Sequence, residues 1–188
     1  MVIGWSGSYS TGPYLQLIED VIQHIVPEYN LKLLVIGAQK KYIQGVKYEL
    51  IPWNAETEVE DLQKIDIGLY PLPNEKWVYG KSGLKAIQFM ALGIPVVATA
   101  IGANSRVIDH GINGFLANNK YEWKSGSIEV PVYTGEDQEY MNNCGWNCWE
   151  QTAPRSYVTR YWGGYYLINE DISWREHLPE NYNPDSTG

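Results

Sequence analysis

The stretch that decides the fold is Gly80-Lys81-Ser82-Gly83-Leu84-Lys85-Ala86-Ile87-Gln88-Phe89-Met90-Ala91-Leu92-Gly93-Ile94-Pro95-Val96-Val97-Ala98-Thr99. It predicts a glycine-containing loop, a helix over residues 82–92, a stop at Gly93 and a strand over residues 95–98. A helix that begins at Ser82-Gly83 presents unbonded backbone N–H groups, and lysines on both sides add positive charge. Such a helix start is suited to binding a diphosphate.

Short apolar runs and amphipathic segments alternate along the first two thirds of the chain. Strands are predicted over residues 2–5, 31–36, 46–51, 66–70 and 95–98. Helices are predicted from Pro13 to a stop at Pro27, from Thr57 with Glu60 completing a capping box, over residues 82–92, and from Asn104 or Ser105 to Asp109. Strands that alternate with helices predict a parallel sheet, and hence an α/β, Rossmann-like doubly wound domain.

Four of the predicted loops follow strands of this sheet. They cover residues 6–12, 52–54, 80–84 and 102–104. In a doubly wound sheet, ligands bind at the carboxyl ends of the strands. Because those ends meet at one edge, we expect the four loops to form a single nucleotide site.

The order of these segments resembles the C-terminal, donor-binding half of a GT-B glycosyltransferase of family 4, also called group 1. The resemblance covers residues 2–123; residues 80–99, 102–104 and 110–117 carry it, and residues 3–10 and 51–54 also fit. It implies half of a GT-B fold that takes a nucleotide-diphospho-sugar, transfers the sugar with retention and needs no metal or other cofactor. It also implies a glycan or lipid-linked acceptor, a role in cell-surface polysaccharide biosynthesis, and an N-terminal acceptor domain. We expect either that a separate chain supplies this acceptor domain or that the present chain is a fragment.

The resemblance assigns roles to individual residues of the predicted site. The donor and phosphate would be bound by Gly7, Ser8, Lys81, Ser82, Gly83, Leu84 and Lys85, and the ribose and base by Gln88 and Trp53. No catalytic residue is identified. The alternatives are that Gly80 and Gly83 only form a tight turn, that Lys85 is a solvated helix residue, and that Trp53 simply covers the end of a strand.

Two carboxylates that many family members carry are missing here. The first Glu of their E-x7-E motif falls on Gly80 and the second on Gln88. The second Glu normally bonds the ribose hydroxyls, and the Gln88 amide can still do so without charge, because it offers an acceptor and two donors. The first Glu normally contacts the donor sugar, and Gly80 has no side chain to replace it.

The composition excludes several classes of protein. A net charge of −8 argues against nucleic acid or an anionic membrane as a partner. No run approaches about 18 apolar residues, and the N-terminus shows no signal-peptide pattern. Cys144 and Cys148 are too few for a disulfide framework. We therefore expect a cytoplasmic protein, peripheral to a membrane only through its partner, and a chain that starts at an internal domain boundary.

The composition changes near residues 121–127, which divides the chain into residues 1–123 and 124–188. The first part has 10 basic and 12 acidic side chains, whereas the second has 4 and 10 and is rich in Tyr and Trp. A strand over residues 127–133 and a hairpin over residues 157–168 predict a small irregular or β-rich aromatic tail. Its aromatic residues are either its only core or a sugar-stacking face, and the second would make the chain a non-catalytic carbohydrate-binding or assembly module.

Overall fold

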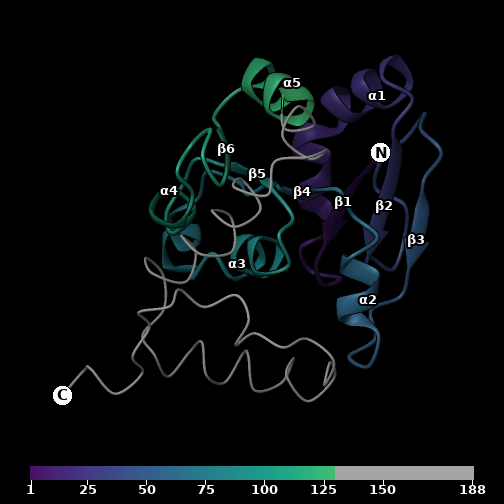
Figure 1. Cartoon of the computed structure of the whole chain (residues 1–188), viewed down its shortest axis with the longest axis horizontal. Helices are drawn as coiled ribbons and strands as arrows, with labels where there is room; N and C mark the ends of the chain where they lie inside the picture. The colour runs from purple at the N-terminus through teal and green to yellow at the C-terminus, as the bar shows by residue number, and fades with distance from the viewer. Residues whose placement is uncertain (130–188) are drawn as a thin grey trace, which may run out of the picture. The chain divides into compact units, whose positions relative to one another are not determined.

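The computed structural model describes residues 1–129 of the chain (Figure 1). Its strands are β1 (Val2–Ser6), β2 (Lys32–Ile36), β3 (Glu49–Ile51), β4 (Ile67–Tyr70), β5 (Val96–Thr99) and β6 (Gly114–Ala117). Its α-helices are α1 (Glu19–Glu28), α2 (Glu58–Leu62), α3 (Leu84–Ala91), α4 (Asn104–Val107) and α5 (Lys120–Glu129), with 3-10 helices η1 (Gly12–Ile18) and η2 (Lys76–Gly80).

The six strands form one parallel sheet in the order β3-β2-β1-β4-β5-β6. The chain moves outward from β1 to β3, then returns to pair β4 with the other side of β1. This order confirms the predicted Rossmann-like doubly wound sheet and places its switch point between β1 and β4. β6 was not among the strands predicted from the sequence, since residues 114–117 contain only two large apolar side chains, Phe115 and Leu116.

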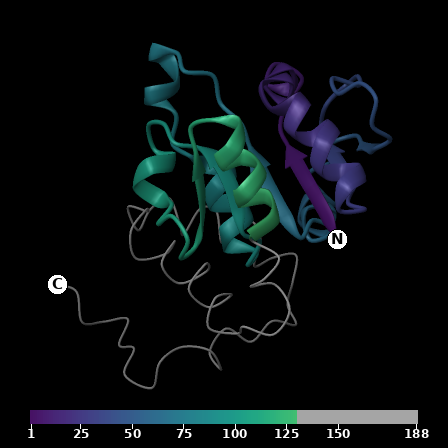
Figure 2. The same cartoon turned by 90° about the horizontal axis from the view of Figure 1, so that it is seen from above.

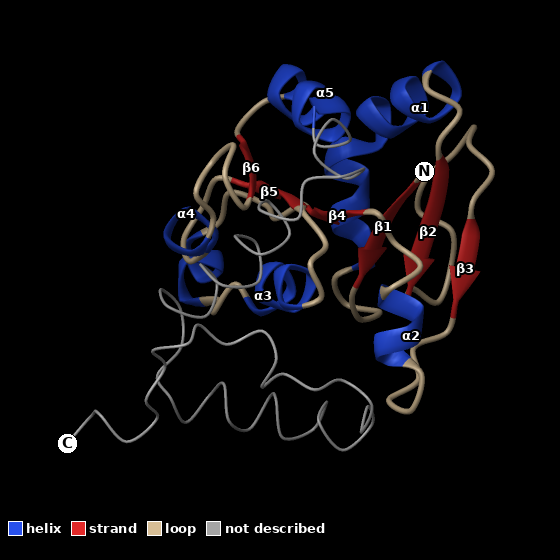
Figure 3. Cartoon of the chain, viewed as in Figure 1, coloured by secondary structure: helices blue, strands red, loops and turns tan. Residues whose placement is uncertain are grey.

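Helices cover both faces of the sheet, and successive strand side chains point to opposite faces. Ile3 and Trp5 pack on the face covered by η1, α1 and α5, while Leu34 and Ile36 pack on the face covered by α2, α3 and α4. Figure 3 shows α1 and α5 on one side of the red strands and α2 and α3 on the other. Two separate apolar layers therefore hold the sheet.

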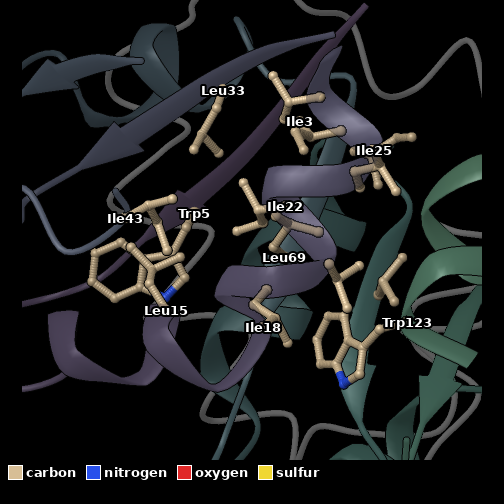
Figure 4. Close-up of a cluster of buried hydrophobic side chains, with 14 of the residues drawn as sticks. Ile3, Trp5, Leu15, Ile18, Ile22, Ile25, Leu33, Ile43, Leu69 and Trp123 are labelled. Atoms are coloured by element: carbon tan, nitrogen blue, oxygen red, sulfur yellow. The ribbon is translucent and has the colours of Figure 1, made fainter. Parts of the chain in front are cut away.

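The layer under α1 is made almost entirely of aliphatic and aromatic side chains (Figure 4). Ile22 and Ile25 of α1 and Leu15 of η1 are fully buried there. Trp123 of α5 packs into the same cluster. Burying one such side chain stabilises the fold by about 1.5–3 kcal/mol, so this face supplies much of the stability of the domain.

Helix α5 lies beside α1, as Figures 1 and 2 both show. The Lys120 ammonium pairs with the Asp20 carboxylate, and Lys124 Nζ lies 3.0 Å from Glu28 Oε2. Gly126 brings the helix close to the sheet, because a Cβ placed there would lie 3.2 Å from Phe115 and Val97 side-chain atoms. The predicted boundary after residue 123 falls inside this helix.

The strand predicted over residues 127–133 is wrong where it can be checked, because residues 127–129 belong to α5. The Ser127 hydroxyl donates to the Trp123 carbonyl at 2.7 Å, a contact made within a helix. The rest of that strand and the hairpin predicted over residues 157–168 lie outside the described residues.

The single helix predicted from Pro13 to Pro27 is divided into the 3-10 helix η1 and the α-helix α1, and two further details of the predicted helix ends differ. Pro27 does not stop the first helix, which continues to Glu28, because the burial of Ile25 and Val26 keeps this last turn on the sheet. The capping box at Thr57 is absent; the Thr57 hydroxyl donates instead to Asp61 Oδ2 at 2.9 Å. Packing of the last turn of α1 thus extends the helix past Pro27, and the Thr57 hydroxyl bonds the Asp61 carboxylate instead of capping α2.

The helix after β5 also starts differently from the prediction. Its N-cap residue is Ala103, and no side chain caps it. Asn104 is buried and its Nδ2 donates to the Thr99 carbonyl at 3.0 Å, so it ties the helix to the end of β5 rather than capping the helix. The helix ends at Val107, two residues before the predicted end at Asp109.

Candidate functional site

The start of α3 gathers three backbone N–H groups, at the exposed residues Ser82 and Leu84 and at the buried Gly83. Gly83 adopts a left-handed conformation with φ +73° and is the N-cap residue. The helix therefore begins at Leu84, two residues after the predicted start at Ser82. No side chain caps this start, and within residues 1–129 no hydrogen bond uses the N–H groups of Ser82, Gly83 or Leu84. Free donors at the positive end of a helix dipole attract an anion.

Gly83 fits this position for steric reasons as well. A Cβ at residue 83 would lie 3.3 Å from the Ala103 Cβ and 3.5 Å from Asn104 Oδ1. Because φ is positive and the loop after β5 is close, any side chain here is strained. Gly80 is different, since a Cβ there meets nothing within 4 Å and the backbone needs no glycine.

Lys81 is held beside this helix start by two aromatic rings. Its Nζ lies 5.1 Å from the centroid of the Trp77 ring and 5.8 Å from that of Tyr14. Both distances suit a cation–π contact. Burial lowers the pKa of Lys81, yet the aromatic faces keep a cation close to the free N–H groups.

Lys85 lies at the centre of a polar cluster that joins three elements. Its Nζ is 3.4 Å from Ser6 Oγ, at the end of β1, and 3.5 Å from Glu58 Oε1 of α2. Gln88 Nε2 donates to the same Glu58 oxygen at 3.2 Å. Lys85 is therefore not a solvated helix residue; its side chain is 24% exposed.

Burial and the neighbouring carboxylate act on Lys85 in opposite directions. Burial lowers the pKa of its ammonium, and the charge and hydrogen bond of Glu58 raise it, with burial the larger effect. The cluster sits at the carboxyl end of β1, beside the switch point of the sheet. It is therefore close to the place where doubly wound sheets bind ligands.

Gly7 and Ser8, predicted to bind phosphate, use their backbone donors inside the fold. The Gly7 N–H donates to the Ile36 carbonyl at 3.1 Å, and the Ser8 N–H donates to Thr11 Oγ1 at 3.1 Å. The Ser8 hydroxyl lies on an exposed loop and contacts the Ser10 hydroxyl at 2.9 Å. A role for Ser8 in binding thus depends on its side chain, and its assignment stays a prediction.

Trp53 follows β3 and is 53% exposed. A Cβ on Gly37 would lie 2.0 Å from the Gly7 carbonyl oxygen and 3.3 Å from Trp53 Cβ, so the ends of β1, β2 and β3 meet here. This exposure leaves both interpretations of Trp53 open, as a stacking surface or as a cover for the strand ends.

Sequence reasoning missed Glu58, Trp77 and Tyr14. Glu58 is 27 residues from Lys85 and 30 from Gln88, so no motif spacing links them. The available signal was its position in the first turn of α2, the helix that follows β3. The start of such a helix lies at the carboxyl edge of the sheet, where doubly wound sheets bind ligands.

His110 has a structural partner rather than a ligand-facing position. Its Nδ1 accepts the Leu116 N–H at 3.1 Å, and its ring meets that of Phe115 edge-on.

None of the helices in residues 1–129 combines the length and apolar character needed to cross a membrane. In the same part of the chain, no three His, Cys, Asp or Glu side chains gather as a metal site. Cys144, Cys148 and the aromatic tail lie outside the described residues.

The strand order and the lysine-flanked start of α3 define the class: a Rossmann-type α/β domain with an uncapped helix start at its candidate site. The chain belongs to the glycosyl transferases group 1 family, whose model matches residues 2–125. This result confirms the resemblance drawn from residues 80–117.

Two relatives in sequence are enzymes by name, one a synthase and the other a glycosyltransferase. The chain is 26% identical to N-acetyl-alpha-D-glucosaminyl L-malate synthase of Bacillus anthracis over 170 residues, 82% of this chain and 43% of that protein. It is 33% identical to D-inositol 3-phosphate glycosyltransferase of Pseudarthrobacter chlorophenolicus over 94 residues, 50% of this chain and 20% of that protein. The chain thus spans less than half the length of these relatives.

Solved structures of other proteins share the fold. A mutant of S. aureus TarM, in complex with fondaparinux, alpha-GlcNAc-glycerol and UDP, matches 87% of this chain and 35% of its own, with a TM-score of 0.64 and 18% identity. Anabaena HepE, in complex with UDP and glucose, matches 94% of this chain and 48% of its own, with a TM-score of 0.56 and 15% identity. At these identities the likeness shows the fold alone.

Proposed function

We propose that this domain is the donor-binding half of a retaining glycosyltransferase that uses a nucleotide-diphospho-sugar. One observation carries the proposal: the uncapped start of α3, with Lys81 and Lys85 beside it, lies at the ligand-binding edge of the sheet. The names of the two sequence relatives, and the UDP in the TarM and HepE complexes, support a sugar nucleotide as the ligand.

The chemistry follows from where charge develops during the transfer. An acceptor hydroxyl oxygen forms a bond to the anomeric carbon and loses its proton. The bond between that carbon and an oxygen of the β-phosphate breaks, and the nucleoside diphosphate leaves with that electron pair and takes up the proton. The N–H groups of residues 82–84 and the two lysines stabilise the growing negative charge. Because backbone donors and ammonium groups supply this stabilisation, we propose that turnover needs no metal or other cofactor.

The acceptor half belongs to the proposal too. We infer that a glycan or lipid-linked acceptor binds to a second domain, in the same protein or in a separate chain, and that the reaction takes place where the two domains face each other. The domain described here then binds the donor, and turnover requires that second domain.

The test is a calorimetric titration of the purified chain with UDP, GDP and ADP, beside the variants Gly83→Asp and Gly80→Ala. We expect one nucleotide to bind saturably, Gly83→Asp to abolish binding and Gly80→Ala to retain it. A carboxylate at residue 83 would strain the loop and repel phosphate, whereas a Cβ at residue 80 meets nothing. Absence of binding by all three nucleotides, or equal binding by Gly83→Asp, would contradict the proposal.

A further inference from the structure

Glu58 is a carboxylate placed where a phosphate site needs positive charge. Its side chain is 16% exposed, and its Oε1 contacts both Gln88 Nε2 and Lys85 Nζ, at 3.2 and 3.5 Å. Withdrawing a carboxylate from water is costly, and a negative charge repels a diphosphate. Its position beside Lys85 therefore calls for an explanation beyond phosphate binding.

The arrangement along α3 separates two kinds of contact. The free N–H groups lie at the start of the helix, and Gln88 follows Leu84 by four residues, which places it on the same face about one turn further. A nucleotide whose phosphates sit on the N–H groups has its ribose as the next group along. In this arrangement Lys85 lies nearest the phosphates, and Glu58 and Gln88 lie nearest the ribose.

The chemistry of Glu58 suits the ribose. An ionised carboxylate only accepts hydrogen bonds, and hydroxyl donors bind it through short, strong contacts. The ribose of a nucleotide offers two adjacent hydroxyls, and a carboxylate bonds a ribose hydroxyl in dinucleotide-binding Rossmann domains. Gln88 alone provides no charge for such a contact.

We propose that Glu58 of α2 accepts hydrogen bonds from the ribose hydroxyls of the nucleotide, with Gln88 beside it, so that two helices together select a ribonucleotide. The inference rests on the proposed function. In the ligand-free domain Glu58 and Lys85 contact each other; with the nucleotide bound, Lys85 turns toward phosphate and Glu58 toward the hydroxyls. The two Lys85 contacts, at 3.4 and 3.5 Å, are long for hydrogen bonds, which makes this exchange easy.

The experiment compares each nucleotide with its deoxy form. Whichever of UDP, GDP and ADP binds is titrated beside its 2′-deoxy and 3′-deoxy analogues, in the wild type, in Glu58→Gln and in Glu60→Gln. Glu60 is exposed on the same helix and carries no role in the site. A thermal melt of each variant checks that it folds.

We expect the wild type to bind at least one deoxy analogue roughly ten- to a hundredfold more weakly, the cost of a hydrogen bond to a charged group. Glu58→Gln should weaken the ribonucleotide by about the same factor and leave the deoxy analogue nearly unchanged, while Glu60→Gln should match the wild type.

Three results would overturn the inference. Equal binding of the ribonucleotide and both deoxy analogues by the wild type would mean that no residue selects the ribose, and this result stands even if Glu58→Gln does not fold. A preference that persists in Glu58→Gln would mean that another group reads the hydroxyls. Absence of binding of any nucleotide would remove the proposed function and this inference together, whereas the first two results leave the proposed function intact.

Discussion

The two faces of the sheet are built differently. The face under η1, α1 and α5 buries almost only apolar side chains, and its charged pairs, such as Lys120 with Asp20, lie at the surface. The face under α2, α3 and α4 buries an apolar core too, but it also holds the half-buried cluster of Glu58, Lys85 and Gln88 at its edge. The first face stabilises the fold, and the second carries the site. Four predictions test this division.

The largest effect is expected from the apolar face. Leu15→Ala removes a fully buried side chain of η1 and should lower the free energy of unfolding by about 2–5 kcal/mol. Leu17→Ala, in the same helix but at a residue 49% exposed, should change it by less than about 0.5 kcal/mol. Denaturant melts measure both changes. The nucleotide affinity of the folded Leu15→Ala variant should equal that of the wild type. A lower affinity would contradict the division between a face that stabilises the fold and a face that binds the nucleotide.

The next effect belongs to Lys85 and depends on pH. Lys85→Met should weaken nucleoside diphosphate binding about tenfold, because it removes a charged donor near the phosphates. Burial lowers the pKa of Lys85, and of Lys81, below the ordinary value of 10.5. Wild-type affinity should therefore fall as the pH rises through that window, measured by calorimetry at neutral and alkaline pH.

The same pKa change has the opposite sign for stability. Between the lowered pKa and 10.5 the unfolded chain holds a proton that the folded chain has lost, so the free energy of unfolding rises with pH in that window. Lys85→Met should reduce both the decline in affinity and this rise in stability. An alkaline profile unchanged in Lys85→Met would show that the buried ammonium is not the titrating group.

A smaller effect is expected from the rings that hold Lys81. Trp77→Ala should weaken nucleotide binding two- to fivefold, since a cation–π contact at an exposed site contributes about 0.5–1 kcal/mol. Trp77→Phe keeps a ring and should fall between the alanine variant and the wild type. Calorimetric titrations compare the three proteins. If Trp77→Ala binds as tightly as the wild type, the aromatic rings do not position the cation.

The smallest effect should come from the surface of the apolar face. Lys120→Ala removes the partner of Asp20 and should lower the free energy of unfolding by at most about 1 kcal/mol, because both side chains are well exposed. Lys120 also lowers the pKa of Asp20, so the pair contributes above the ordinary Asp pKa and is lost as the pH falls through the lowered value. Melts at neutral and acidic pH, at low and high salt, measure this contribution.

The fold could be predicted from the sequence because its signals are local. Continuous apolar runs such as residues 33–36, and the Gly stop after α3, each mark an element without knowledge of its neighbours. The helix α5 was not predicted because Gly126 and Ser127, in its second half, suit a helix only when it lies tightly against Phe115 and Val97. That contact joins residues distant in sequence.

Part of the geometry of the candidate site could be predicted in the same way. Lys81, Gly83 and Lys85 share one short motif, and the structure brings their segment to the predicted edge. Glu58 could not be found in this way, because only the folding of α2 against α3 places it beside Lys85 and Gln88. The cation–π contact of Lys81 with Tyr14 likewise joins η1 to the loop before α3.

The most direct test of the division between the two faces is a backbone amide NMR titration of the chain with the nucleotide that binds. The account predicts the largest shifts at the amides of residues 82–85, with Glu58 and Gln88 also moving, while α1 and α5 stay nearly unchanged. Shifts that centre on α1 and α5, or that leave residues 82–85 unmoved at saturation, would contradict it.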